Sequence, residues 1–180
     1  RIVLALKDIK YQKKEVHLLN QGGEQNHPDY QTLNPQKLVP VLVENEVGFS
    51  ITQSLAIIDY LEAEHPSPSI YGIDNKVNAQ IKSFSQAICC DIHPLNNLRV
   101  LNYLTDTLST TKKENLNWYH HWLKEGFTAL EKQLTQSKRE KLFCFSDKVT
   151  LADVCLIPQW YNAQRFELDL SPYPILNSIN

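Results

Sequence analysis

Along the second half of the chain, apolar side chains recur every three or four positions, a spacing that places them on one face of a helix. The first run extends from Ile81 to Leu98, and Pro94 should kink it because proline removes a backbone donor. A second run extends from Leu116 to Leu134, and a third begins at Thr150 and includes Tyr161. This half of the chain is therefore predicted to be helical.

The first third of the chain has shorter apolar patterns separated by polar loops. Residues 1–7 are typical of the end of a helix, and the alternation at Lys14–Leu19 predicts a strand. Residues 39–43 and 46–51 predict a β-hairpin, and Ser54–Glu64 predicts a helix that follows it directly. Together these elements indicate a small mixed α/β region.

The Pro-Ser-Pro-Ser stretch at residues 66–69 is the one linker-like segment of the chain. We therefore predict an α/β domain over residues 1–66 and an all-helical domain over residues 72–180.

Composition limits the classes of function. Lys and Arg number 18 and Asp and Glu number 20, for a formal charge of -2, so no basic field points to nucleic acid. No apolar run approaches the roughly 20 residues that a membrane span needs. The four cysteines have neither CxxC nor zinc-ligand spacing, which favours reduced thiols in the cytosol. We expect no metal, nucleic-acid or membrane partner.

Gln53 and Ser54 lie where a strand passes directly into a helix. Ser54 is a good N-cap, and the free N–H groups of a helix start can bind a carboxylate, with the Gln53 amide as a further donor. The alternative is a plain helix cap, which is the commoner case.

The Val39-Pro40 pair is a second candidate. A cis bond here would turn the backbone N–H and C=O of Val39 outward, where they could pair with a peptide-like ligand as an added strand does. The alternative is an ordinary trans entry into the strand, since only ~5% of X–Pro bonds are cis.

Three polar features interrupt the helical half. Thr150 and Asp153 have the spacing of a capping box, which is a folding signal rather than a catalytic one. The polar residues of segment 93–99 either line a cleft or form a solvated helix face. Arg165 either complements the end of a helix dipole or clamps a carboxylate with its planar fork.

These segments together resemble the zeta class of glutathione transferases, and the likeness spans nearly the whole chain. Segments 91–99 and 162–166 look specific to that class, whereas the central pieces are general to the superfamily. The resemblance is carried by residues 1–7, Leu33–Pro40, Gln53–Leu61, Asp91–Leu98, Thr150–Gln159, 162–166 and 169–174.

The resemblance implies a thioredoxin-like N-terminal domain, an all-α C-terminal domain and a cytoplasmic homodimer that uses glutathione. The family motif that activates the glutathione sulfur would precede Arg1, so no residue of this sequence is expected to do so. Arg165 is expected to bind a carboxylate of a small dicarboxylate substrate. Glutathione is expected at Gln25, Val39, Pro40, Gln53, Ser54, His93, Asn97, Leu98 and Arg99.

The implied reaction is the isomerisation of maleylacetoacetate to fumarylacetoacetate, in tyrosine and phenylalanine catabolism. Within the same fold, three alternatives stay open. They are conjugation of glutathione to halogenated acids or other electrophiles, isomerisation of maleylpyruvate, and a binding module that has lost its chemistry.

Overall fold

A computed structural model describes residues 1–137 and 142–179. The chain folds into two compact units, Arg1–Ser69 and Ile70–Asn180, called unit 1 and unit 2 below.

Unit 1 is a small mixed unit around one hairpin. Strands β1 and β2 are antiparallel, with Val41 opposite Thr52 at one end of the ladder and Glu44 opposite Phe49 at the other. Its elements are α1 (Ile2–Leu6), short 3₁₀ turns at Asn20–Gly22 and Glu24–Asn26, α2 (Pro28–Leu33), β1 (Val41–Glu44), β2 (Phe49–Thr52) and α3 (Ser54–Glu64).

The contact between α1 and α3 has a charged pair at its edge. Lys7 is fully buried, and its Nζ lies 2.7 Å from the Glu62 carboxylate. The same ammonium donates to the carbonyls of His65, at 2.5 Å, and Pro68, at 2.8 Å. Lys7 therefore joins α1 to the segment that follows α3.

The strand predicted at Lys14–Leu19 is wrong. In the part of the chain that the structure describes, the sheet has two strands, and this segment pairs with neither. Instead, the backbone N–H of His17 donates to Glu24 at 2.8 Å, and His17 Nδ1 accepts from the N–H groups of Leu19 and Asn20. These local side-chain bonds replace the ladder bonds that a strand requires.

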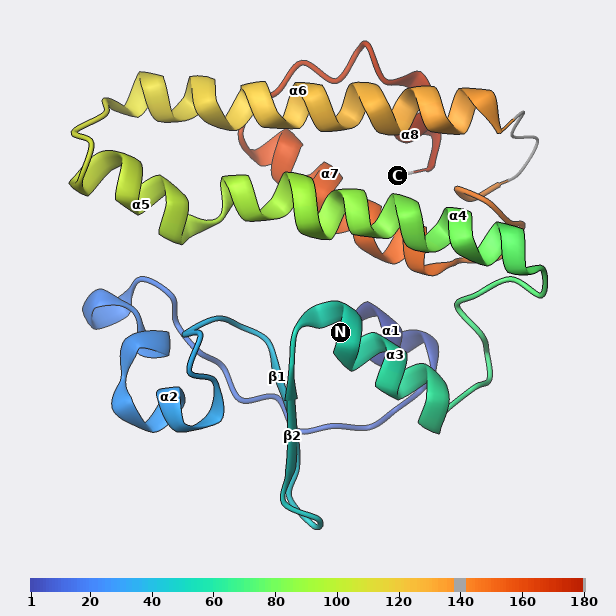
Figure 1. The fold of residues 1–180 in the computed structure, drawn as a ribbon, viewed down its shortest axis with the longest axis horizontal. Helices are drawn as coiled ribbons and strands as arrows, with labels where there is room; N and C mark the ends of the chain where they lie inside the picture. The colour runs from blue at the N-terminus through green and yellow to red at the C-terminus, as the bar shows by residue number, and fades with distance from the viewer. Residues whose placement is uncertain (138–141, 180) are drawn as a thin grey trace. The chain divides into compact units, whose positions relative to one another are not determined.

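Unit 2 is helical, as predicted. Figure 1 shows the long helix α6 beside the interrupted line of α4 and α5, and α7 packs against α4. The irregularity expected at Pro94 is present and is larger than a kink, because the chain passes through a π-helical and a 3₁₀ turn there. The elements are α4 (Asn75–Gln86), the π turn (Ala87–Ile92), the 3₁₀ turn (His93–Asn96), α5 (Leu98–Asp106), α6 (Lys112–Gln136), α7 (Leu151–Arg165) and α8 (Pro174–Ile179).

The core of unit 2 follows the apolar runs, except that two of their members are exposed. Leu116 is 39% exposed and Tyr161 is 61% exposed, whereas Trp160 beside Tyr161 is fully buried. Helix α7 is buried on several sides, so no single three-to-four spacing marks its core face. The buried members of the first two runs are Ile81, Phe84, Ile88, Ile92, Tyr119, Leu123, Phe127, Leu130 and Leu134.

The capping box predicted at the start of α7 is confirmed. One carboxylate oxygen of Asp153 accepts from the backbone N–H and the hydroxyl of Thr150, at 2.8 and 2.7 Å. The other oxygen accepts from the N–H of Cys144 at 2.8 Å, so the buried Asp153 also holds the chain that leads into α7. Among the described helices, none is both long and apolar enough to cross a bilayer.

Candidate functional site

The hairpin of unit 1 brings two predicted binding segments to one place. Because Val41 pairs with Thr52, the next residues outward, Pro40 and Gln53, emerge side by side at the same end of the ladder. Of the two alternatives for the Val39–Pro40 bond, the structure has the cis form. Val39 is 42% exposed, and within the described chain its backbone N–H and C=O are not engaged in a hydrogen bond.

The start of α3 differs from the prediction in one respect. Ser54 is not the N-cap: Gln53 occupies that position, and Ser54 is the first helical residue. Gln53 turns the chain from strand into helix with φ 69° and ψ 119°, so no loop residue separates the two elements. A positive φ at a non-glycine residue costs roughly 1–3 kcal/mol, and such strained residues cluster at functional sites. The conformation does not by itself mark a site, since Asp8, Lys37, Ser109 and Glu167 adopt it as well.

No side chain caps the first turn of α3. Its leading N–H groups, together with the exposed Ser54 hydroxyl, therefore face outward with a partial positive charge. The Gln53 side chain is held by a 2.7 Å hydrogen bond from its Nε2 to Gln36 Oε1. This end of unit 1 thus offers exposed strand-like backbone at Val39 beside an anion-binding helix start.

Gln25 lies in a separate turn of unit 1. Its Nε2 donates to the Leu18 carbonyl at 3.4 Å, while its Oε1 is buried and has no partner in the described chain. No hydrogen bond links Gln25 to Val39 or Ser54 among the described residues.

Sequence reasoning missed the residues that hold the loop before Val39. The side chains of Asn34 and Tyr30 both donate to the Leu38 carbonyl, at 2.6 and 2.7 Å. The signal available was the Asn-Pro pair directly after a short helix, since asparagine bonds to nearby backbone at such turns.

In unit 2, the predicted segment 93–99 is fixed to α6. The indole N–H of Trp118 donates to the Leu95 carbonyl at 2.8 Å, and the buried Asn96 donates to the Tyr119 carbonyl at 3.3 Å. Asn97 caps α5 by accepting from the N–H of Arg99 at 3.2 Å. The Asn97 side chain therefore has a structural role at the start of α5.

His93 and Arg99 are exposed at the two ends of this segment. The pKa of His93 is lowered because neighbouring protein atoms partly desolvate the imidazole even though the residue reaches the surface. His93 is therefore neutral near pH 7, where it can donate or accept one hydrogen bond.

Arg165 lies at the end of α7, and its neighbourhood contacts the same turn of α6. The rings of Tyr119 and Phe166 stack with their centroids 3.9 Å apart, and His120 Nε2 lies 2.6 Å from the Phe166 carbonyl. Burial raises the pKa of Tyr119 to about 12, whereas the charge of Arg165 acts in the opposite direction. Segments 93–99 and 162–166 thus flank one turn of α6.

Arg165 itself is exposed and forms no salt bridge within the described residues. Its guanidinium carbon lies 5.3 Å from the centroid of the Phe166 ring, a cation–π contact. An unpaired guanidinium on an aromatic ring remains able to bind a carboxylate through two parallel bonds.

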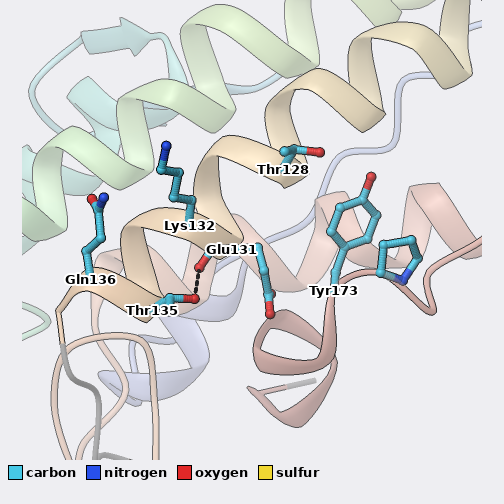
Figure 2. A pocket seen from close by; sticks show the side chains of 7 residues that line it. Thr128, Glu131, Lys132, Thr135, Gln136 and Tyr173 are labelled. Atoms are coloured by element: carbon cyan, nitrogen blue, oxygen red, sulfur yellow. Dashed lines mark hydrogen bonds between the residues drawn. The ribbon is translucent and has the colours of Figure 1, made fainter.

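Elsewhere in unit 2, a pocket of about 460 Å³ lies between α6 and the approach to α8 (Figure 2). It contains none of the predicted site residues. The Glu131 carboxylate caps the start of α8 by accepting hydrogen bonds from the N–H groups of Ile175 and Leu176, at 2.8 and 2.9 Å. Among the described residues, no group of three or more His, Cys, Asp or Glu side chains could hold a metal.

Residues 1–69 match the model of the glutathione S-transferase N-terminal domain. The chain is 44% identical to a probable maleylacetoacetate isomerase of Vibrio cholerae, over 99% of this chain and 81% of that protein. A solved maleylpyruvate isomerase, described as a bacterial zeta-class glutathione S-transferase, is 35% identical with a TM-score of 0.93, over 99% of this chain and 82% of that one. A maleylacetoacetate isomerase of Methylobacterium extorquens, solved with malonate and glutathione, is 32% identical with a TM-score of 0.93 over the same shares.

Proposed function

Because the chain belongs to the maleylacetoacetate isomerase family of zeta-class glutathione transferases, we propose that it isomerises maleylacetoacetate to fumarylacetoacetate with glutathione as cofactor. Its fold is that of the glutathione transferases, with a thioredoxin-like first part and a helical second part. The observation that carries the proposal is the end of the hairpin, where exposed Val39 backbone and an uncapped α3 lie side by side.

These groups fit glutathione by chemical type. The γ-glutamyl carboxylate suits the first turn of α3, where Ser54 and the free N–H groups donate and Gln53 adds an amide. The cysteinyl backbone suits the N–H and C=O of Val39, beside Pro40. The proposed contacts also include Gln25 and, in unit 2, His93, Asn97, Leu98 and Arg99.

The chemical difficulty of the reaction is rotation about a carbon–carbon double bond. When bound, glutathione supplies a thiolate whose reversible addition to the conjugated alkene permits that rotation. The chain must then hold two substrate carboxylates and place donors where negative charge develops. Arg165 is proposed to bind one carboxylate, because its exposed guanidinium has no competing acidic partner in the described chain.

The proposal is tested by steady-state assay of the full-length protein with and without glutathione. Isomerisation should require glutathione, and a rate that is equal in its absence would refute the mechanism. Maleylpyruvate should be assayed in parallel, since a maleylpyruvate isomerase is among the similar structures. The ratio of the two kcat/KM values identifies the preferred substrate.

The two binding assignments have separate tests. Ser54→Ala should weaken glutathione binding by roughly 1–3 kcal/mol, the cost of losing a hydrogen bond to a charged group. Calorimetry that finds the same affinity would remove this assignment. Arg165→Ala should lower kcat/KM roughly tenfold to a hundredfold. Arg165→Lys should restore only part of kcat/KM, because the lysine ammonium lacks the planar pair of N–H donors of a guanidinium. An unchanged kcat/KM would remove the clamp while leaving the reaction class intact.

The resemblance to the family also supports a cytoplasmic homodimer with a glutathione-binding domain at 1–66 and a helical domain at 72–180. Light scattering of the full-length protein should give the mass of two chains, and the mass of one chain would contradict the dimer.

A further inference from the structure

The loop between α2 and β1 is organised around one buried amide. Asn34 is 2% exposed, and its Nδ2 donates to the Leu38 carbonyl at 2.6 Å. Its Oδ1 accepts from the N–H of Gln36 at 3.0 Å, and its backbone carbonyl accepts from the N–H of Lys37 at 3.0 Å. A single side chain therefore holds the loop on both sides of its bend.

Tyr30 adds a second bond to the same carbonyl. Its hydroxyl donates to Leu38 O at 2.7 Å, so this oxygen accepts two side-chain hydrogen bonds. Burial raises the pKa of Tyr30, which keeps the hydroxyl protonated and able to donate. Two donors on one carbonyl fix the direction in which that carbonyl points.

The direction of the Leu38 carbonyl determines the direction of the next N–H. The Leu38–Val39 peptide is trans, so the C=O of Leu38 and the N–H of Val39 lie in one plane and point in opposite directions. Holding the carbonyl toward Asn34 and Tyr30 therefore turns the Val39 N–H the other way, on an exposed residue. A carbonyl that accepts hydrogen bonds also polarises its own peptide unit, which strengthens that N–H as a donor.

The same loop reaches the start of α3. Gln36, whose N–H is bound by Asn34, accepts from Gln53 Nε2 at 2.7 Å through its side chain. Asn34 is thus linked through Gln36 to Gln53, the N-cap residue of α3.

We propose that Asn34 and Tyr30 are positioning residues that aim the Val39 N–H at the peptide backbone of glutathione. The inference rests on the proposed function, because it assigns a task at the same binding site. The competing explanation is that both side chains only stabilise unit 1. The two explanations differ in what happens to binding when the fold is intact.

The experiment compares two tyrosine variants by calorimetry with glutathione. Tyr30→Phe removes one of the two donors to Leu38. Tyr60→Phe is the matched control, since its hydroxyl also makes one 2.7 Å bond, to Glu44 at the far end of the hairpin. Tyr30→Phe should raise the Kd for glutathione about threefold to tenfold, as expected for a weakened hydrogen bond, and Tyr60→Phe should leave it unchanged.

Asn34→Ala should raise the Kd further, by about tenfold or more. The KM for glutathione should rise in Tyr30→Phe and in Asn34→Ala, while kcat at saturating glutathione stays within about twofold of the value for the unmodified protein. Equal Kd values for Tyr30→Phe, Tyr60→Phe and the unmodified protein would overturn the inference, even if Asn34→Ala failed to fold.

Amide NMR of the labelled protein measures the Val39 N–H directly and so distinguishes a positioning role from a general loss of stability. On adding glutathione, the Val39 N–H should shift in the unmodified protein and shift less in Tyr30→Phe, while the Ser54 N–H shifts equally in both. Equal Val39 shifts would overturn the positioning role. If the unmodified protein does not bind glutathione at all, the proposed function itself fails, which this comparison separates from a failure of positioning.

Discussion

Units 1 and 2 hold their candidate binding groups in different ways. In unit 1, the groups are backbone N–H and C=O at Val39 and at the start of α3, and the polar side chain of Asn34 holds the Leu38 carbonyl next to Val39. In unit 2, the groups are side chains at helix ends, such as Arg165, and the helices that carry them pack on a large apolar core. Among described residues, the buried apolar side chains of unit 1 are Val3, Leu4, Ile57 and Leu61.

This difference separates two kinds of mutational effect. A single donor removed from the loop of unit 1 should change ligand binding more than it changes the free energy of unfolding. A side chain removed from the core of unit 2 should do the reverse, because packing sets the helix positions there. The predictions below test this contrast.

The largest effect is expected in the core of unit 2. Phe127 is fully buried, stacks on Trp160 with centroids 5.7 Å apart and meets Tyr173 edge-on. Phe127→Ala should lower the free energy of unfolding by about 3–5 kcal/mol, because the cavity cannot collapse fully. Chemical denaturation measures this loss. Leu116→Ala, at a more exposed position on the same helix, is the control, and equal losses would contradict the packing account.

The next effect concerns the charged pair of unit 1. Lys7→Met should cost about 3 kcal/mol, because it removes the buried ammonium that pairs with the largely buried Glu62 carboxylate. Lys13→Met is the matched control, since Lys13 pairs with Glu15 at 2.6 Å but both side chains are largely exposed. Denaturation curves should separate the two variants clearly. If they coincide, unit 1 does not depend on its buried polar bonds.

Unit 2 also contains a buried polar residue, Asp153, that holds its backbone in place. Its removal should have a smaller effect on stability than the two changes above. Asp153→Ala removes the acceptor of the Thr150 and Cys144 N–H groups and should cost about 2 kcal/mol. Glu114→Ala breaks the exposed capping box at the start of α6 and should cost much less. Both residues belong to capping boxes, but only Asp153 is buried. Thermal unfolding of the two variants therefore tests whether burial of the capping box determines the loss of stability.

The smallest effect is the titration of His93. Because desolvation lowers its pKa from 6.5, the unfolded chain binds this proton more readily than the folded chain does. Stability should therefore fall slightly as the pH drops below about 6.5 and be unaffected above it. NMR titration, with His93→Gln to assign the signal, should give a midpoint below 6.5. A midpoint at or above that value would contradict the lowered pKa.

The sequence predicted features that depend on short-range rules. Thr150 and Asp153 satisfy a capping box by spacing alone, and Pro94 removes a backbone donor from the helical run that it interrupts, so both outcomes followed from local chemistry. A proline alone does not decide the outcome, since Pro158 lies inside α7. The helix at Ser54–Glu64 was predicted correctly because a strand precedes it directly and Pro66 follows its end.

Features that depend on which group a residue contacts in the folded chain were missed. Alternation at Lys14–Leu19 resembles a strand, but a strand needs a paired neighbour, and His17 bonds to Glu24 instead. The α3 N-cap moved to Gln53 because the hairpin feeds the helix without a loop. The role of Asn34 depends on a bend that brings Leu38 back to it, which periodicity does not report.

The central claim is that glutathione acts here as a catalyst and is not consumed. The most direct measurement is NMR of the full-length protein with excess maleylacetoacetate and a small amount of glutathione, following the alkene protons and glutathione together. We predict many conversions to fumarylacetoacetate per glutathione, with free glutathione constant throughout. Product that stops at one equivalent of glutathione, with a stable conjugate in its place, would contradict isomerisation and indicate a conjugating transferase.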